Sequence, residues 1–212
     1  MSLLTPYYEH DGIVIYHGDC RDILPHLPKV DLVLTDPPYG IGERMQGGTW
    51  GAAKKYADFR RWDIAPTTEV FTMLKEQSKY QIVWGGNYFG LDPSRCWLVW
   101  DKQNAVKTMA DCELAWTNLD RPAKRFSWPV GIHEWGHPTE KPLELMQWCI
   151  ALIKPDATIL DPTPAYILDP FMGTGTTLRA AKDLGRKCIG IEIEEKYCEI
   201  AARRLGQEVL AL

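Results

Sequence analysis

Short apolar runs separated by turn residues recur along this chain of 212 residues. Their length and their content of β-branched residues predict buried β-strands. The expected strands lie at residues 13–16, 30–35, 81–84, 96–100, 113–116, 166–169 and 188–191.

Between these runs, apolar residues recur at helical spacing and predict a second kind of element. The expected helices lie at residues 21–27, 142–153, 177–184 and 195–205. One more helix is expected to begin after a capping sequence at Thr67. Strands that alternate with helices predict an α/β fold with a mostly parallel sheet. The length of the chain favours a single domain over residues 1–212.

Two segments, about 41–62 and 118–136, lack periodicity and combine basic residues with aromatic ones. The net charge of −4 argues against a general coat of nucleic-acid-binding charge but not against a local basic patch. Phosphate contact and a solvated loop are both open for each segment. The candidate phosphate-contacting residues are Arg44, Lys54, Lys55, Arg60, Arg61, Arg121, Lys124 and Arg125.

Composition argues against several classes of protein. No run approaches the ~18 consecutive apolar residues of a membrane span, and the first residues lack the pattern of a secretory signal. The six cysteines are scattered without a Cys-x-x-Cys pair, which predicts reduced, mostly buried thiols and no metal site. We therefore expect a cytoplasmic protein.

The first candidate site, Asp36-Pro37-Pro38-Tyr39, directly follows the predicted strand at residues 30–35. Consecutive prolines must end that strand, because they cannot continue a β-ladder. The motif presents a carboxylate, backbone carbonyls and a ring at the carboxyl end of a strand, where open α/β sheets bind ligands. The carboxylate and a carbonyl suit the amino group of a flipped-out nucleobase, on which the ring stacks. Taken alone, the motif is more often a strand stopped by proline.

The second candidate site joins the predicted strand at residues 166–169 to the next helix. Gly173 and Gly175 allow a ligand to approach the backbone at a helix N-terminus. The loop lacks the Gly-Lys-Ser/Thr of a Walker loop, and Leu178 replaces the third glycine of a dinucleotide fingerprint. Glu192 ends the following strand, at the position where a carboxylate meets a ribose in nucleoside-type cofactor sites.

With both motifs in view, nearly the whole chain resembles the S-adenosylmethionine-dependent amino DNA methyltransferases of the N6-adenine/N4-cytosine family. The catalytic tetrapeptide precedes the cofactor glycines, which is the permuted, beta-type order of that family. The resemblance implies a Rossmann-like methyltransferase fold with a circularly permuted, mostly parallel seven-stranded sheet. It also implies DNA as a partner, S-adenosylmethionine as cofactor and DNA contact by the segments at about 41–62 and 118–136.

The resemblance also implies roles for individual residues. Asp36, Pro37, Pro38 and Tyr39 match the catalytic motif. The segment 137–142 resembles one that helps to enclose the cofactor, and within it Lys141 either reaches the cofactor carboxylate or lies at a helix start. The expected cofactor-binding residues are Asp19, Asp169, Phe171, Gly173, Gly175, Thr176, Glu192, Thr139 and Lys141.

Three questions stay open at this point. Asp36 favours N6-adenine as the target, and N4-cytosine is the alternative, because that branch of the family more often has Ser before the two prolines. The sequence Ile-Leu-Asp-Pro occurs at residues 159–162 and again at 167–170. We expect the second copy to form the strand, since it joins the glycine loop. If the first copy forms the strand instead, residues 162–169 loop out and the glycine loop is displaced. That arrangement would favour a catalytically inactive binding module. The oligomeric state, monomer or homodimer, is also open.

Overall fold

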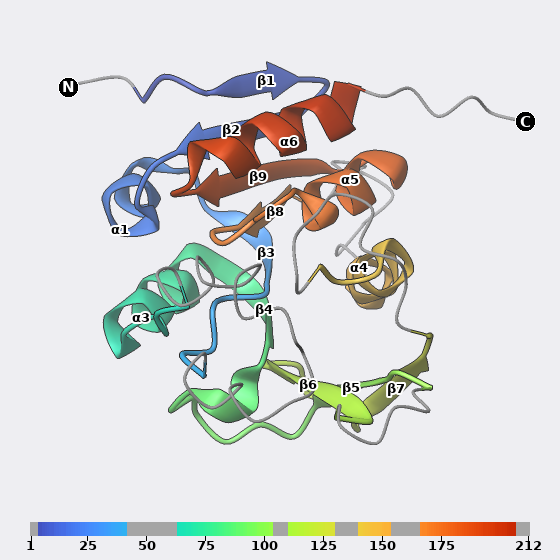
Figure 1. The fold of residues 1–212 in the computed structure, drawn as a ribbon. Helices are drawn as coiled ribbons and strands as arrows, with labels where there is room; N and C mark the ends of the chain where they lie inside the picture. Colours follow the sequence, from blue (N-terminus) through green and yellow to red (C-terminus); the bar gives the residue numbers. More distant parts are fainter. Residues whose placement is uncertain (1–3, 42–62, 104–109, 130–139, 154–165, 207–212) are drawn as a thin grey trace, which may run out of the picture.

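The computed structural model of the chain describes residues 4–41, 63–103, 110–129, 140–153 and 166–206 (Figure 1). Within these ranges, none of the helices combines the length and the apolar character that a membrane crossing requires. The elements are, in chain order, β1 (Tyr8–His10), β2 (Ile13–His17), α1 (Cys20–Ile23), the 3-10 helix η1 (Leu24–His26), β3 (Val30–Thr35), α3 (Thr68–Gln77), β4 (Ser78–Trp84), the 3-10 helix η3 (Gly86–Tyr88), β5 (Trp97–Asp101), β6 (Cys112–Thr117), β7 (Lys124–Ser127), α4 (Leu143–Leu152), β8 (Tyr166–Asp169), α5 (Thr176–Asp183), β9 (Lys187–Glu192) and α6 (Glu195–Gly206).

The strands described here form one nine-stranded sheet in the order β1-β2-β9-β8-β3-β4-β6-β5-β7. Most neighbouring strands run parallel, which confirms the predicted α/β class. The apolar pattern predicts seven strands, and this number is too low, because β1 and β7 add one strand at each edge. Both edge strands are short and largely exposed, so neither produces the apolar run on which the prediction depends. β7 also shows that the segment 118–136 is not irregular throughout.

Strands from the two ends of the chain meet in the middle of the sheet. β8 pairs in parallel with β3, and β9 pairs in parallel with both β8 and β2 (Figure 1). Parallel neighbours end at the same edge of a sheet. The end of β3, which precedes Asp36, therefore lies beside the end of β8, which precedes the glycine loop. This pairing brings the two candidate sites together.

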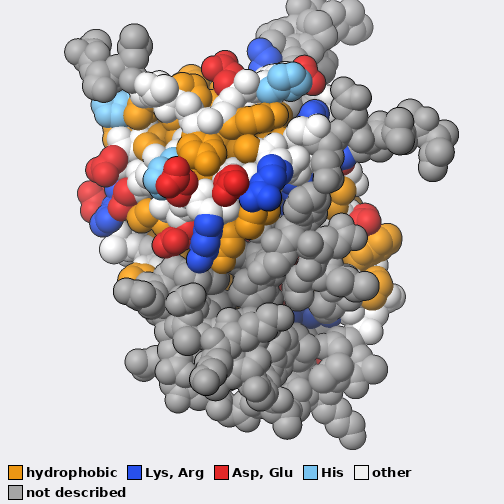
Figure 2. Space-filling view, turned by 45° about the horizontal axis from the view of Figure 1, so that its top comes forward, with side chains coloured by type: hydrophobic (Ala, Val, Ile, Leu, Met, Phe, Trp, Pro, Cys, Tyr) orange, Lys and Arg blue, Asp and Glu red, His pale blue; other side chains and the backbone are white. Residues whose placement is uncertain are grey.

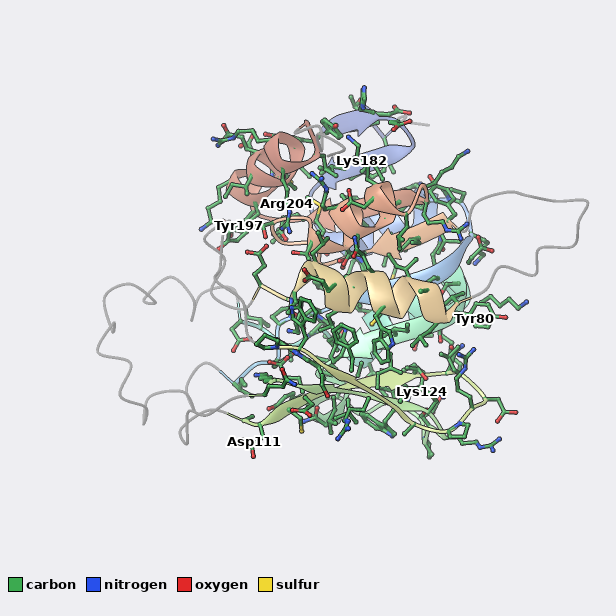
Figure 3. All side chains as sticks on the ribbon, turned by 90° about the vertical axis from the view of Figure 1, so that its right-hand side faces the viewer. Tyr80, Asp111, Lys124, Lys182, Tyr197 and Arg204 are labelled. Atoms are coloured by element: carbon green, nitrogen blue, oxygen red, sulfur yellow. The ribbon has the colours of Figure 1, made fainter. Side chains whose placement is uncertain are left out.

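Helices cover both faces of the sheet, and the alternation of residues in β3 shows why. Leu32 and Leu34 pack into the core formed with α4, α5 and α6, whereas Val33 packs into the core formed with α1, η1 and α3. Figure 1 shows these two groups of helices on opposite sides of the sheet, and Figure 3 shows α4, α5 and α6 side by side in one layer. Central strands that are buried on both faces explain the continuous apolar runs in the sequence.

The second copy of the repeated Ile-Leu-Asp-Pro sequence forms the strand that leads into the glycine loop. β8 spans Tyr166–Asp169, and Pro170 follows it directly. This placement confirms the expectation for the second copy. The first copy, at residues 159–162, lies outside the described residues.

The cysteines lie in the described part of the chain, and all six are free thiols. Five of them are buried, and Cys112 is exposed. This distribution confirms the expectation of mostly buried thiols, which here pack as small apolar side chains in the core.

Candidate active site

Asp36 and Tyr39 form a hydrogen-bonded pair just beyond the carboxyl end of β3. The Tyr39 hydroxyl donates to Oδ1 of Asp36 at 2.6 Å. The Tyr39 ring packs directly against Gly85, which follows β4 with a φ of +68°, and a Cβ on Gly85 would lie 2.1 Å from Cε1 of the ring. The ring also stacks on Tyr88, with 4.9 Å between the ring centroids and an interplanar angle of 21°. The tetrapeptide therefore presents a carboxylate and an aromatic ring in a defined arrangement.

A second set of charged groups, of which the sequence singles out only Lys141, surrounds Asp36. Nζ of Lys141 donates to Oδ2 of Asp36 at 2.5 Å and lies 3.1 Å from Oε2 of Glu113. Nζ of Lys102 lies 2.6 Å from Oε1 of Glu113. The Lys141 side chain is only 4% exposed, so these contacts are shielded from water. Among the described residues, Lys141 thus contacts the carboxylate expected to be catalytic.

The direction of β6 explains how Glu113 reaches this pocket. β6 runs antiparallel to β4, with Ala115 opposite Trp84, so its amino end lies at the carboxyl end of β4. Glu113 pairs with Trp100 of β5, and Lys102 follows the end of that strand. The sequence contains one signal for this role, a carboxylate at the start of an otherwise apolar strand. Its meaning depends on a strand direction that the sequence pattern does not reveal.

Burial and neighbouring charge shift the pKa values of this cluster in different directions. Burial raises the pKa of Asp36 above its ordinary value, although Lys141 opposes the shift. Burial also acts to raise the pKa of Glu113, but Lys141 and Lys102 outweigh it and hold that pKa at about 2. Burial acts to lower the pKa of Lys141, and the two carboxylates more than compensate and raise it. Burial raises the pKa of Tyr39 as well, so its hydroxyl stays neutral and donates.

Asp169 connects this pocket to the glycine loop. Its Oδ1 accepts hydrogen bonds from the Thr35 hydroxyl at 2.7 Å and from the Phe171 backbone N–H at 3.2 Å. Asp169 is buried, and burial raises its pKa to about 6. Its carboxyl group therefore helps to set the geometry at the start of the loop.

Two glycines determine the path of the loop before α5. Gly173 and Gly175 have φ values of +51° and +79°, which favour glycine. A Cβ on Gly175 would lie 2.9 Å from Cβ of Ala201, so this glycine also allows the loop to pack against α6. α5 begins directly after Gly175, and the backbone N–H groups of its first turn have no partner within the helix. The loop thus turns tightly at both glycines before α5 begins.

Glu192 and Asp19 supply carboxylates at the ends of β9 and β2. One oxygen of Glu192 accepts a hydrogen bond from the backbone N–H of Gly173 at 3.0 Å, and burial raises the pKa of Glu192. The backbone N–H of Gly18 donates to the Glu192 carbonyl at 2.9 Å, which places Asp19 beside this strand end. Both oxygens of Asp19 accept hydrogen bonds from the Arg21 side chain, which lowers the pKa of Asp19.

Thr176, the first residue of α5, is part of a buried polar cluster. Nη1 of Arg204 in α6 donates to Oε1 of Glu140 at 2.7 Å and to Oγ1 of Thr176 at 3.0 Å. The side chains of Arg204 and Glu140 are 7% and 9% exposed. Arg204, for which the sequence offers no signal beyond a charge among apolar helix positions, joins the residues before α4 to the start of α5.

The structure describes three of the eight basic residues that are candidates for phosphate contact. Lys124 and Arg125 are exposed on the edge strand β7, and Arg121 is half-buried before it. Figure 3 shows Lys124 at the β5–β7 end of the molecule. At the opposite end, near β1 and α6, Figure 2 shows acidic and basic side chains interspersed among the described residues. Thr139 and the remaining basic candidates lie outside the described residues, namely Arg44, Lys54, Lys55, Arg60 and Arg61.

Comparison with known proteins relates these features to a family. A sequence profile of DNA methylases, N6_N4_Mtase, matches residues 99–203. The putative methylase YubD of Escherichia coli (strain K12) is 30% identical over 219 residues, which cover 92% of this chain and 88% of that protein. The type II methyltransferase M.ScaI of Streptomyces caespitosus is 27% identical over 275 residues, which cover 100% of this chain and 87% of that protein. A solved structure of PvuII DNA methyltransferase (cytosine-N4-specific) matches with a TM-score of 0.64 and 18% identity. The match covers 97% of this chain and 90% of that one, which shows a common fold.

Proposed function

The chain belongs to the N6-adenine/N4-cytosine family of DNA methylases, and we propose that it is a site-specific enzyme that moves a methyl group from S-adenosylmethionine to the exocyclic N6 of adenine in DNA. The observation that supports this proposal is the juxtaposition of its two sites. The Asp36–Tyr39 pair and the glycine loop follow the paired parallel strands β3 and β8. A base bound at one site and a nucleoside cofactor bound at the other meet at the same edge of the sheet.

The residues at the ends of β8, β9 and β2 suit S-adenosylmethionine. Glu192 and Asp19 offer carboxylate oxygens that accept hydrogen bonds from ribose hydroxyls and from the adenine amino group. Arg21 must turn away before Asp19 takes this role, and its exposed side chain is free to do so. We assign the methionine end to Asp169, Phe171, Gly173, Gly175 and Thr176. When bound, S-adenosylmethionine supplies an electrophilic methyl group on a sulfonium.

Asp36 and the Pro37 carbonyl orient the target amino group in this proposal. An exocyclic amine is a poor nucleophile, so accurate positioning supplies much of the rate. The ionised Asp36 carboxylate accepts hydrogen bonds from the amino group and stabilises the positive charge that develops on the nitrogen. We assign the Tyr39 ring to stack on the base, which there takes the place of Tyr88, the partly exposed ring that now stacks on Tyr39. Asp36 therefore acts as acceptor and countercharge more than as a strong base.

We assign DNA contact to the segments at about 41–62 and 118–136 of the single domain. Lys124 and Arg125 support this assignment, because their exposed side chains lie on an edge strand beside β5. They lie opposite Leu98 and Val99, ahead of the end of β5 at which Lys102 follows and contacts Glu113. Basic side chains in this place suit phosphate groups of DNA that extends away from the flipped nucleotide.

The proposal is tested by methyl transfer from labelled S-adenosylmethionine to amplified DNA, which starts without base methylation. The wild-type protein is expected to produce N6-methyladenine, identified by mass after digestion to nucleosides. Asp36→Ala is expected to bind S-adenosylmethionine in a calorimetric titration and to transfer nothing. Asp92→Asn, which changes an exposed carboxylate paired with Lys75, is the matched control and keeps full activity.

Three other outcomes of this experiment would each change the proposal. N4-methylcytosine as the product would support the cytosine alternative. Cofactor binding by the wild-type protein without any transfer would support a binding module. An active Asp36→Ala variant would show that Asp36 does not have the assigned role.

A further inference from the structure

The Lys141 ammonium occupies the position that the target amino group requires. An ammonium has three N–H donors, and three acceptors surround this one. They are Oδ2 of Asp36 at 2.5 Å, Oε2 of Glu113 at 3.1 Å and the Tyr39 hydroxyl at 3.3 Å. Nζ of Lys141 also lies 5.6 Å from the centre of the Tyr39 ring. Both oxygens of Asp36 are already engaged, Oδ1 by the Tyr39 hydroxyl and Oδ2 by Lys141, so a base amino group that approaches Oδ2 competes with Lys141.

We propose that Glu113 is a positioning residue that retains the Lys141 ammonium in the pocket while Asp36 exchanges it for the amino group of the target base. This inference rests on the proposed function, in which Asp36 accepts hydrogen bonds from that amino group. Glu113 already contacts Nζ of Lys141, so the exchange needs no new partner. Its other carboxylate oxygen is held by Lys102 at 2.6 Å, which keeps the carboxylate in place.

The charges of the cluster explain why a second acceptor is needed. Two carboxylates, 18% and 23% exposed, balance two buried ammonium groups. Lys141 is only 4% exposed, so water offers its ammonium little compensation for the loss of Asp36. An unpaired buried charge is strongly unfavourable. Glu113 removes this obstacle, because the ammonium keeps one carboxylate when the base takes the other.

The same arrangement predicts opposite pH responses for two substitutions. Asp36 faces Lys141, Glu113 and the Tyr39 hydroxyl, and Lys102 and the carboxyl of Asp169 are the next charged groups. Methyl transfer needs the ionised Asp36 carboxylate, so its rate falls at low pH; this fall is the acid limb of the pH profile. Without Lys141, Asp36 faces the like charge of Glu113, which favours its protonation and moves the acid limb to higher pH. Without the Glu113 charge, that repulsion is lost and the acid limb moves to lower pH.

Initial rates of methyl transfer to amplified DNA, from about pH 5 to about pH 9, test this inference. The variants are Glu113→Gln and Lys141→Met, with Asp92→Asn as the matched control. Glu113→Gln is expected to raise the apparent KM for DNA roughly ten- to hundredfold, because Lys141 then has Asp36 as its remaining carboxylate and competes more strongly. Its affinity for S-adenosylmethionine, measured by calorimetry, stays that of the wild type and shows that the variant is folded. Glu113→Asp, which keeps the charge but shortens the side chain, is expected to give an intermediate KM and serves if Glu113→Gln does not fold.

Three results overturn the inference while the wild-type enzyme is active. The first is an unchanged apparent KM for DNA in Glu113→Gln, or in Glu113→Asp where that variant replaces it. The second is a shift of both acid limbs in the same direction. The third is a loss of rate that is equal at every pH, as a purely structural role predicts. A wild-type protein that transfers no methyl group overturns the proposed function together with this inference, so the two failures are distinguishable.

Discussion

The hydroxyl of Thr35 donates a buried hydrogen bond to Oδ1 of Asp169 at 2.7 Å across 134 positions of the chain. Thr35 ends β3, and Asp169 ends β8, its parallel neighbour in the sheet. The bond therefore joins the residue before the proposed catalytic tetrapeptide to the residue that leads into the glycine loop. The relative position of the two proposed substrates depends on this contact.

Asp169→Asn is expected to change the pH dependence of stability. Burial raises the pKa of Asp169 from 3.8 to about 6, against the hydrogen bonds from Thr177 and Thr35. A carboxyl group with a raised pKa contributes stability that is present below about pH 4 and is lost as the pH rises through about 6. The free energy of unfolding of the wild type should therefore fall, relative to that of Asp169→Asn, by on the order of 2 kcal/mol over this range.

Urea titrations at about pH 4 and about pH 7 measure the Asp169 effect. Asp120→Asn is the matched control, because Asp120 is an exposed carboxylate in an ion pair with Arg95. It should follow the wild type at both pH values. A difference between wild type and Asp169→Asn that stays constant with pH would contradict the assignment.

Gly85→Ala is expected to reduce methyl transfer far more than cofactor binding. The new Cβ would lie 2.1 Å from the Tyr39 ring, at a residue whose φ is +68°. The ring must move, and a small misplacement beside the reacting group costs about a hundredfold in rate. Gly90→Ala is the matched control, since nothing lies within 4 Å of its Cβ position. Single-turnover rates and cofactor titrations of both variants give the comparison. Equal activity of the two variants would show that the contact between Gly85 and Tyr39 does not matter for catalysis.

Arg204→Met is expected to destabilise the protein by about 3 kcal/mol and to weaken binding of S-adenosylmethionine. The substitution leaves the buried Glu140 carboxylate without the guanidinium that now holds it 2.7 Å away beside Thr176. Arg203→Met changes the next residue of the same helix, which forms an exposed pair with Glu199, and should alter the unfolding free energy by no more than about 0.5 kcal/mol. Urea unfolding and calorimetric titration measure the two effects. Equal losses in both variants would count against a special role for Arg204.

The double substitution Lys124→Gln and Arg125→Gln is expected to weaken DNA binding for all sequences alike. Loss of two phosphate contacts should reduce the slope of log affinity against log salt concentration by about 1.8. The double substitution Lys29→Gln and Lys187→Gln removes the same charge at the amino ends of β3 and β9 and should leave the slope unchanged. Binding isotherms at several salt concentrations determine the slopes. A slope equal to that of the wild type would remove β7 from the DNA-contacting surface.

The elements around the two motifs follow from local signals in the sequence. Two prolines end β3, and the strand at residues 166–169 is a continuous apolar run before a glycine loop. Such signals depend on neighbouring residues only, so they are readable without the fold. The edge strands β1 and β7 have no comparable signal, because their pairing partners and not their own apolar content hold them in the sheet. The sequence therefore predicts too few strands.

The sequence by itself determines the two motifs, the strands and turns that present them and the family to which the chain belongs. Those features lie in short continuous segments, where backbone preference and apolar pattern act directly. Only the tertiary structure decides that Lys141 and Glu113 lie beside Asp36, and that Arg204 holds Glu140 and Thr176. Those contacts join segments that are distant in the chain, and they depend on strand order, on strand direction and on burial. The partners of a buried charge are set by the fold as a whole, so no local pattern predicts them.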